Sequence, residues 1–251
     1  MKCGLIGRKL SHSYSPQIHS YFSEYEYKLY ELEPNDLESF MKSNDLDAFN
    51  VTIPYKKDVI PYCNKLSVGA ERIGAVNTIV KEKDGKLSGY NTDYYGFLYM
   101  LNSTDVDVKD KKAIILGSGG ASLTCQVVLN DLGASEVVVI SRNSENNYNN
   151  LNKHLNAEVI VNATPVGMYP NIENSPIDLT DFKQCEAVLD LIYNPAKTKL
   201  LKQADELNIN NANGLSMLVA QAKKAYELFT DSCIDDSIIE KILKDFKLWK
   251  F

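Results

Sequence analysis

A lysine and an aspartate each end a short segment of strand-forming residues, where a side chain can act as an acid or a base. Lys56 ends the segment N-V-T-I-P-Y-K, in which a proline stops a strand that carries polar side chains. Asp93 ends the segment G-Y-N-T-D after another predicted strand. A lysine in this position can protonate a carbonyl oxygen as hydride arrives, and can take the proton back in the reverse direction. Taken singly, Asp93 fits a helix N-cap better than a catalyst.

A cluster of hydroxyl groups follows the first predicted strand and precedes a helix. It has the sequence S-H-S-Y-S-P at residues 11–16, so hydroxyls and helix N–H groups can converge on a carboxylate. Ser15 followed by Pro16 is equally well suited to a plain helix N-cap, and taken alone this second interpretation is preferred. His12 and His19 lie close in sequence, but no third or fourth ligand stands at a recognisable spacing, so no metal site is predicted.

A glycine-rich turn marks a candidate cofactor site. Residues 117–122 read G-S-G-G-A-S between an apolar strand and a helix, where backbone N–H groups can approach a pyrophosphate. Such a turn can also be purely structural. The next strand ends in Ser141-Arg142-Asn143, without the acidic residue that binds a free ribose 2′-hydroxyl. Arg142 therefore favours the 2′-phosphate of NADP, the alternative being a solvated surface arginine.

The first ninety residues predict an α/β domain with a mixed sheet. Short apolar runs at residues 3–7, 25–32, 48–53 and 75–80 are typical of strands, and residues 35–43 of a helix. Asp84-Gly85 is a hairpin signal, which predicts that residues 75–80 pair antiparallel with residues 86–90.

From Lys111 the pattern changes to that of a doubly wound, Rossmann-like parallel sheet. It predicts strands at residues 113–116, 136–140, 158–162, 187–191 and 209–213, with a helix at 121–132. Amphipathic helices are expected at 215–229 and 234–246. We therefore expect a substrate-binding and catalytic domain at residues 1–101, completed by the C-terminal helices within 215–251, and an NADP-binding domain at 102–214.

Composition excludes several functional classes. The formal charge of −6 argues against a nucleic-acid partner, which needs clustered Lys and Arg. The N-terminal apolar run is too short for a signal peptide, and no stretch is long enough to span a bilayer, so a soluble, cytoplasmic protein without a membrane partner is expected. The 5 cysteines are odd in number and widely spread, which fits reduced thiols better than disulfides or a zinc site.

Eight co-linear motifs make the chain resemble the shikimate dehydrogenase family over nearly its full length. In the first half these are S-H-S-Y-S-P, N-V-T-I-P-Y-K, G-A-V-N-T at residues 74–78 and N-T-D at 91–93. The second half adds G-S-G-G-A-S, N-A-T-P-V-G-M at 162–168, D-L-I-Y-N-P at 190–195 and N-G-L-S-M-L-V-A-Q-A at 213–222. The resemblance implies an NADP-dependent oxidoreductase that interconverts 3-dehydroshikimate and shikimate, in the chorismate route of aromatic amino-acid biosynthesis.

The resemblance also implies roles for individual residues. Lys56 and Asp93 are expected to be the catalytic pair. The substrate carboxylate is assigned to Ser13 and Ser15, and its ring oxygens to Thr52, Asn77, Asp93 and Gln221. Tyr193 is expected to lie near the substrate. The cofactor is assigned to Gly117, Gly119, Gly120, Ala121, Arg142, Thr164, Gly214 and Met217. The small-molecule substrate is the expected partner, with the protein a monomer or a homodimer.

Departures from the family pattern lie mainly in the cofactor half. Asn143 and Asn146 stand where a threonine and a second basic residue are common, which predicts a weaker preference for NADP. The interval from Arg142 to Asn162 is filled by an expected helix at residues 144–155 and the strand at 158–162. It is too short for the extra strand and helix usual in the family, so five parallel strands are expected. Two alternatives remain: a quinate or dual quinate/shikimate dehydrogenase using NAD, and a non-catalytic dinucleotide-binding regulator.

Overall fold

The computed structural model describes residues 1–11, 13–22, 25–43 and 45–248, and the chain divides into two compact units. Unit 1 comprises residues 1–93 and 219–248, and unit 2 comprises residues 94–218. The division falls inside two helices, α4 (Asp93–Asn102) and α7 (Leu215–Thr230). Both changes of unit thus lie a few residues away from the boundaries expected from the sequence, because continuous helices carry the chain from one unit into the other.

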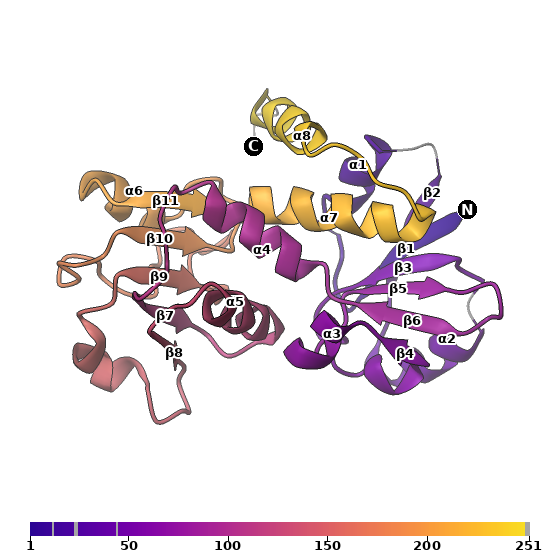
Figure 1. The fold of residues 1–251 in the computed structure, drawn as a ribbon, viewed down its shortest axis with the longest axis horizontal. Coiled ribbons are helices and arrows are strands. Elements are labelled where there is room, and N and C mark those ends of the chain that lie inside the picture. The colour runs from indigo at the N-terminus through magenta and orange to yellow at the C-terminus, as the bar shows by residue number, and fades with distance from the viewer. Residues whose placement is uncertain (12, 23–24, 44, 249–251) are drawn as a thin grey trace. The chain divides into compact units, whose positions relative to one another are not determined.

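Unit 1 contains a six-stranded mixed sheet in the order β2-β1-β3-β5-β6-β4 (Figure 1). The strands are β1 (Lys2–Gly7), β2 (Glu26–Glu31), β3 (Ala48–Val51), β4 (Lys65–Leu66), β5 (Thr78–Lys81) and β6 (Leu87–Tyr90). Strand β1 is parallel to β2 and β3, whereas β5 is antiparallel to β3 and β6. The mixed sheet and the hairpin at Asp84-Gly85 are confirmed. The two-residue strand β4, parallel to β6, was too short to predict.

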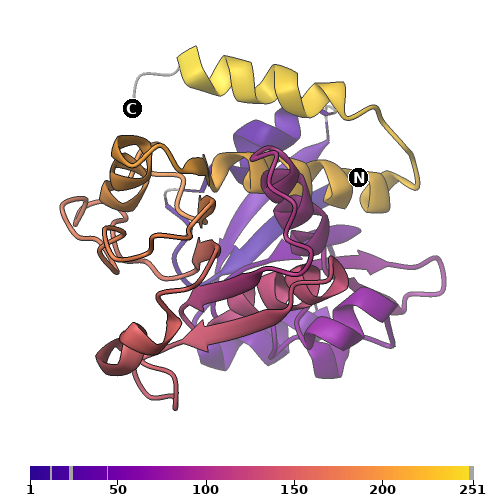
Figure 2. The same ribbon diagram turned by 60° about the vertical axis from the view of Figure 1, so that its left-hand side comes forward.

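Short helices connect these strands and enclose the core of unit 1. They are α1 (Ser15–Ser20), η1 (Pro34–Asp36), α2 (Leu37–Ser43), η2 (Ile60–Tyr62) and α3 (Val68–Ile73). Helix α3 has complete caps, since the Ser67 side chain accepts a hydrogen bond from Ala70 N and Gly74 ends it in the left-handed conformation. The chain closes with α7 and α8 (Ser237–Leu248), drawn in orange and yellow in Figure 2.

Unit 2 contains a five-stranded parallel sheet in the order β11-β10-β9-β7-β8. Its elements are β7 (Lys112–Leu116), α5 (Gly120–Asp131), β8 (Glu136–Ile140), η3 (Tyr148–His154), β9 (Val159–Asn162), β10 (Ala187–Asp190), α6 (Lys199–Glu206) and β11 (Asn210–Asn213). Alternate residues of β7 enter two different clusters: Ala113 and Ile115 pack in one, and Ile114 and Leu116 in the other. Apolar cores therefore cover both faces, as a parallel sheet requires.

The sheet of unit 2 has five strands, as the short interval after Arg142 predicts. Strand β8 is the outermost strand, and the fully described residues 143–158 add no strand between it and β9. The α-helix expected at residues 144–155 was wrong: a kinked 3₁₀ helix, η3, stands there instead. Asn147 caps it through a reciprocal capping box with Asn150, and Asn150 has non-helical backbone angles. The run of asparagines therefore favours caps and turns over a regular helix.

Two further expectations from composition can be compared with the structure. None of the five cysteines, all of which lie in the described part of the chain, forms a disulfide bond. Among the described residues, none of the helices combines the length and the apolar character needed to cross a bilayer.

Candidate active site

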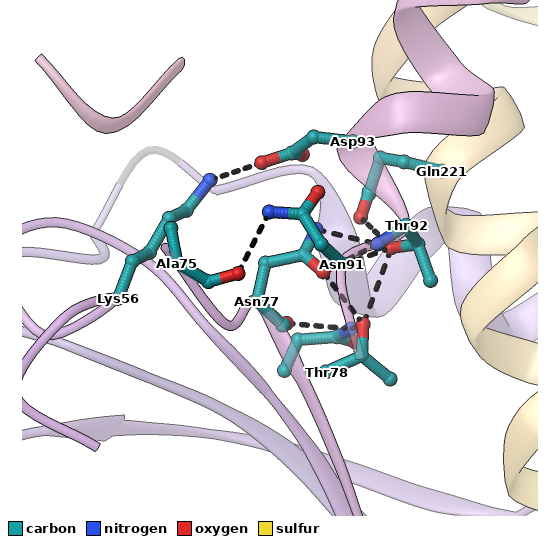
Figure 3. A network of polar contacts seen from close by, with 9 residues as sticks. Lys56, Ala75, Asn77, Thr78, Asn91, Thr92, Asp93 and Gln221 are labelled. Atoms are coloured by element: carbon teal, nitrogen blue, oxygen red, sulfur yellow. Dashed lines mark hydrogen bonds and ion pairs between the residues drawn. The ribbon is translucent and has the colours of Figure 1, made fainter. Parts of the chain in front are cut away.

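Lys56 and Asp93 form an ion pair inside unit 1, with Nζ 2.5 Å from Oδ2 (Figure 3). Only 16% of the lysine side chain and 9% of the aspartate side chain are exposed. The turn that carries Lys56 is held on both sides: the buried Tyr55 donates its hydroxyl to Leu32 O, and Lys56 O accepts from Val76 N at 2.7 Å. Asp93 is the first residue of α4. The structure thus brings together the two residues whose types suggested acid-base chemistry.

A cluster of amides and hydroxyls lies beside this pair in unit 1 (Figure 3). The Asn77 side chain accepts from Thr92 N at 2.7 Å, and its Nδ2 donates to Thr92 Oγ1 at 3.0 Å. The Thr92 hydroxyl lies 3.3 Å from Gln221 Oε1. Thr78 Oγ1 lies 3.0 Å from Asn77 Oδ1. Of the predicted ring-binding residues, Asn77, Asp93 and Gln221 are therefore neighbours, and Asn77 is almost completely buried.

Asn91 adds a buried acceptor to the same region. Its Nδ2 donates to Ala75 O at 2.9 Å, which fixes the orientation of the amide because a carbonyl can only accept. Its Oδ1 is buried without a hydrogen-bond partner among the described residues. A buried acceptor of this kind is costly unless a donor reaches it.

The serines expected to bind a carboxylate are also neighbours. Ser13 Oγ lies 3.2 Å from Ser15 Oγ, and Ser15 is buried at the start of α1. Thr52 follows β3, where its N–H donates to Ile6 O at 2.9 Å and its methyl group occupies the space beside Gly7. The structure places Ser13, Ser15 and all of the predicted ring-binding residues in unit 1, whereas Tyr193 belongs to unit 2.

The two N-terminal histidines give no support to a metal site. His12 lies outside the described residues. His19 is buried and stacks on Tyr27 with ring centroids 4.0 Å apart, and its Nδ1 is hydrogen-bonded to the Tyr25 hydroxyl. Burial lowers the pKa of His19 to about 3, so the ring is neutral. Among the described residues no group of three or more His, Cys, Asp or Glu side chains could hold a metal ion.

The glycine-rich turn in unit 2 has the geometry of an anion-binding loop. Gly117 has a φ of 103°, and a Cβ there would lie 3.0 Å from Ala163 O, so only glycine fits. Gly119, in contrast, would direct a Cβ into open space at the start of α5. Helix α5 also begins without a side-chain cap. Its first N–H groups, with Gly120 and Ala121 in the first turn, are therefore accessible to a pyrophosphate.

Arg142 is exposed and follows the edge strand β8. Burial raises the pKa of the nearby Tyr148, and the charge of Arg142 partly opposes that shift. The loop around Arg142 is ordered by its own polar groups: Ser141 N donates to Asn146 O at 3.1 Å, and Ser144 donates to the same carbonyl. Arg142 therefore lies in a loop that is held by its own hydrogen bonds.

Asn162 and Asp190 form a buried polar centre that links two loops of unit 2, one after β9 and one between β10 and α6. Asn162 Nδ2 donates to Asp190 Oδ1 at 2.9 Å, and Asn162 Oδ1 accepts from Thr164 Oγ1 at 2.7 Å. Asp190 also accepts from Thr198 Oγ1 at 2.7 Å and from Ile192 N at 3.1 Å. Burial raises the pKa of Asp190 to about 6, although these hydrogen bonds oppose the shift. The predicted cofactor residue Thr164 is therefore fixed in place beside Gly117, which its methyl group approaches.

The remaining predicted residues lie near the end of the unit 2 sheet. Tyr193 is in the loop after β10. Gly214 has no room for a side chain, because a Cβ would lie 2.0 Å from Leu191 O. Met217 is 8% exposed and packs in the core of unit 2. Packing against Leu191 therefore requires glycine at position 214, whether or not a ligand binds there.

Sequence reasoning missed several buried polar residues as parts of the site. Asn50, Thr78 and Thr92 were noted only within motifs, and Asn162 and Asp190 were given no role. A signal did exist, because Asn50, Thr78, Asn162 and Asp190 are polar residues at buried strand positions. Buried polar groups need partners, so such positions point to a network.

Comparisons with known proteins agree with this arrangement. Residues 5–79 match the family model described as the shikimate dehydrogenase substrate binding domain. The shikimate dehydrogenase (NADP(+)) of Caldicellulosiruptor bescii is 40% identical, with 97% of this chain and 94% of that protein covered. The crystal structure of shikimate dehydrogenase 1 from Peptoclostridium difficile is 38% identical, has a TM-score of 0.91, and covers 99% of this chain and 98% of its own. The Thermus thermophilus shikimate 5-dehydrogenase in complex with NADP(H) and shikimate is 29% identical, with a TM-score of 0.84 and coverage of 96% and 97%.

Proposed function

This chain belongs to the shikimate dehydrogenase family, and on that premise we propose that it catalyses the NADP-dependent, reversible reduction of 3-dehydroshikimate to shikimate. The observation that carries the proposal is the Lys56–Asp93 pair, 2.5 Å apart and largely shielded from solvent. A family member with this pair intact has the acid-base groups that carbonyl reduction requires. The reaction belongs to the shikimate pathway of aromatic amino-acid biosynthesis.

In the proposed reduction, Lys56 is the proton donor. NADPH held by the glycine-rich turn of unit 2 would supply the hydride for the carbonyl carbon. Lys56 Nζ gives a proton to the carbonyl oxygen, which becomes the hydroxyl of shikimate, and the amine then regains a proton from solvent. Asp93 accepts a hydrogen bond from Nζ and keeps the ammonium in place, which lowers the cost of orienting the donor. In the oxidative direction Lys56, as the neutral amine, would take the hydroxyl proton, and Asp93 would again hold Nζ in place.

The substrate would be held by polar groups of unit 1 together with Tyr193. Ser13 and Ser15 would bind its carboxylate, and their adjacent hydroxyls support that role. Thr52, Asn77, Asp93 and Gln221 would bind its ring oxygens. A polyol acid needs many hydrogen-bond partners, because each buried polar group of the site rejects a ligand that lacks the matching group.

NADP would be held in unit 2. Gly117, Gly119, Gly120 and Ala121 would receive the pyrophosphate, a role supported by the open space in front of Gly119 and the uncapped start of α5. Arg142 would bind the 2′-phosphate, Thr164 would line the groove, and Gly214 and Met217 would border the nicotinamide. Unit 1 would thus be the substrate-binding and catalytic domain, and unit 2 the cofactor domain.

The protein would act in the cytoplasm as a monomer or homodimer, on small molecules and without nucleic-acid or membrane partners. Its formal charge of −6 supports the exclusion of nucleic acid.

Steady-state rates test the proposal. Shikimate and quinate are each oxidised with NADP and with NAD at one pH, and kcat/KM is expected to be highest for shikimate with NADP. A higher value for quinate with NAD would favour the quinate dehydrogenase alternative. Absence of turnover in all four combinations, with NADP still bound, would favour a non-catalytic regulator.

A further inference from the structure

Six side chains of unit 1 form a continuous series of hydrogen bonds that ends beside the catalytic pair. They come from strands β2, β3 and β5, the turn residue before β5, the residue before α4 and helix α7. In order they are Tyr27, Asn50, Thr78, Asn77, Thr92 and Gln221. Asn50, Asn77, Thr78 and Thr92 are each at most 5% exposed, so solvent does not compete for their hydrogen bonds.

The backbone fixes the direction of this series at Asn50. Asn50 Nδ2 lies 3.3 Å from Asn77 O, which can only accept, so the nitrogen must face that carbonyl. Asn50 Oδ1 then accepts from the Tyr27 hydroxyl at 2.8 Å. Asn50 Nδ2 also donates to Thr78 Oγ1 at 3.1 Å. Having accepted from Asn50, the Thr78 hydroxyl is left with one proton to donate onward.

A second backbone group fixes the direction at Asn77. Thr92 N can only donate, and it lies 2.7 Å from Asn77 Oδ1, so this oxygen must face Thr92. The same oxygen receives the Thr78 proton at 3.0 Å, which occupies both of its lone pairs. Asn77 Nδ2 therefore donates to Thr92 Oγ1 at 3.0 Å. The Thr92 hydroxyl lies 3.2 Å from Asn77 Oδ1, 3.2 Å from Thr78 Oγ1 and 3.3 Å from Gln221 Oε1. Asn77 Oδ1 already accepts two hydrogen bonds, which favours donation of the Thr92 proton to Gln221 Oε1.

We propose that Thr78 and Thr92 are positioning residues that hold the amides of Asn77 and Gln221 in one orientation, each oxygen toward a threonine hydroxyl. Figure 3 shows Gln221 Oε1 directed at Thr92. Asn77 Nδ2 donates one proton to Thr92 Oγ1, so its second N–H, together with Nε2 of Gln221, then acts as a donor to the oxygens of the substrate ring. Asp93 supplies the complementary acceptor. This inference rests on the proposed function and deepens it.

The fixed orientation has a consequence for specificity. An amide that could rotate would present either its oxygen or its nitrogen to the ligand. It would therefore tolerate a ligand in which one ring hydroxyl is changed. An amide held as a donor loses its partner when the ligand lacks the matching oxygen, and a buried donor without a partner is costly. The two threonines therefore govern how strongly the enzyme rejects a shikimate analogue that lacks one ring hydroxyl.

The experiment replaces each threonine by its apolar isostere, in Thr92→Val and Thr78→Val. The KM for shikimate is expected to rise roughly tenfold in each, the factor that corresponds to about 1.4 kcal/mol. The value of kcat should change much less, because Lys56 and Asp93 are untouched. The ratio of kcat/KM for shikimate to that for its 4-deoxy or 5-deoxy analogue measures the preference for shikimate. For at least one of the two analogues this ratio should fall by a similar factor. Thr92→Ser restores the hydroxyl and should restore both quantities.

Thr124→Val is the matched control. Thr124 is also fully buried, but its Oγ1 has no hydrogen-bond partner among the described residues, and it lies on α5 of unit 2. This variant should leave the KM for shikimate unchanged. If Thr78→Val does not fold, Thr92→Val and Thr92→Ser decide the matter between them.

Three results would overturn the inference: an unchanged KM in Thr92→Val, an equal loss for shikimate and both deoxy analogues, or the same loss in Thr124→Val. A wild-type enzyme that does not oxidise shikimate would instead refute the proposed function.

Discussion

Replacing Lys56 by methionine isolates the contribution of its ammonium group. Methionine keeps an unbranched stem of similar length, so packing around the turn is largely preserved. The change leaves the Asp93 carboxylate, whose side chain is 9% exposed, without its cationic partner. Lys57 offers a matched control, because it is the next residue in the chain and is exposed.

The expected loss in turnover follows from the role of Lys56 as proton donor. General acid-base catalysis contributes about 100- to 10,000-fold to a rate, or about 3 to 5 kcal/mol of transition-state stabilisation. The Lys56 side chain is only 16% exposed, so water has little access to its position and cannot readily replace the lysine as proton donor in the variant. Removing one partner of a buried ion pair costs about 3 to 5 kcal/mol of stability. Because this pair keeps some exposure, we expect a smaller loss, about 1 to 3 kcal/mol.

Two assays and one control variant check these values. Steady-state kinetics should show a kcat lowered by at least about 100-fold in Lys56→Met, with a KM for shikimate changed by less than about tenfold. Urea denaturation should show the loss of stability. Lys57→Met should resemble the wild type in both assays. A Lys56→Met enzyme with normal kcat and a raised KM would refute the role of Lys56 as proton donor and make it a binding residue.

Three further predictions concern other charged groups. Asp93→Asn should lower kcat more than it raises the KM for shikimate, and the opposite pattern in steady-state kinetics would mean that Asp93 only binds. Arg142→Ala should weaken NADP far more than NAD in binding titrations, since guanidinium pairs with phosphate but gains little from a hydroxyl; equal losses would place Arg142 outside the phosphate site. Asp190→Asn tests the raised pKa of Asp190: the protonated acid stabilises the fold below the usual value of 3.8, and this contribution is lost as pH rises through about 6. The stability of the wild type relative to Asp190→Asn should therefore fall by up to about 3 kcal/mol between pH 4 and pH 7, and a pH-independent difference would contradict the shift.

Much of the fold could be predicted because its strands obey simple local rules. The buried runs of β7, β9 and β10 are continuous and apolar, as parallel strands covered on both faces must be. Chain length alone excluded a sixth strand after Arg142. The 3₁₀ helix η3 was missed because side-chain hydrogen bonds of Asn147 and Asn150 compete with helical ones, an outcome that spacing does not reveal.

The neighbouring residues Lys56 and Asp93 could be located from motifs, but the network beside them could not. Asn50 and Thr78 are aligned only by the antiparallel register of β3 and β5, which brings residues 28 positions apart into contact. A shift of one residue in that register would turn the two side chains to different faces. Sequence spacing carries no information about this register, so the partners of Asn50 become apparent only in the folded sheet.

The network nevertheless leaves a trace in the sequence, because its members occupy positions where a buried strand normally carries apolar residues. Asn50 is 5% exposed and Thr78 is fully buried. Each would cost free energy unless its donors and acceptors were matched, and the matching groups come from β2 and from Asn77, the residue before β5. Apolar side chains of similar volume would fill the same space without that cost. Polar residues retained at several such positions therefore indicate a demand other than stability, and fixing the orientation of Asn77 and Gln221 is a demand of that kind.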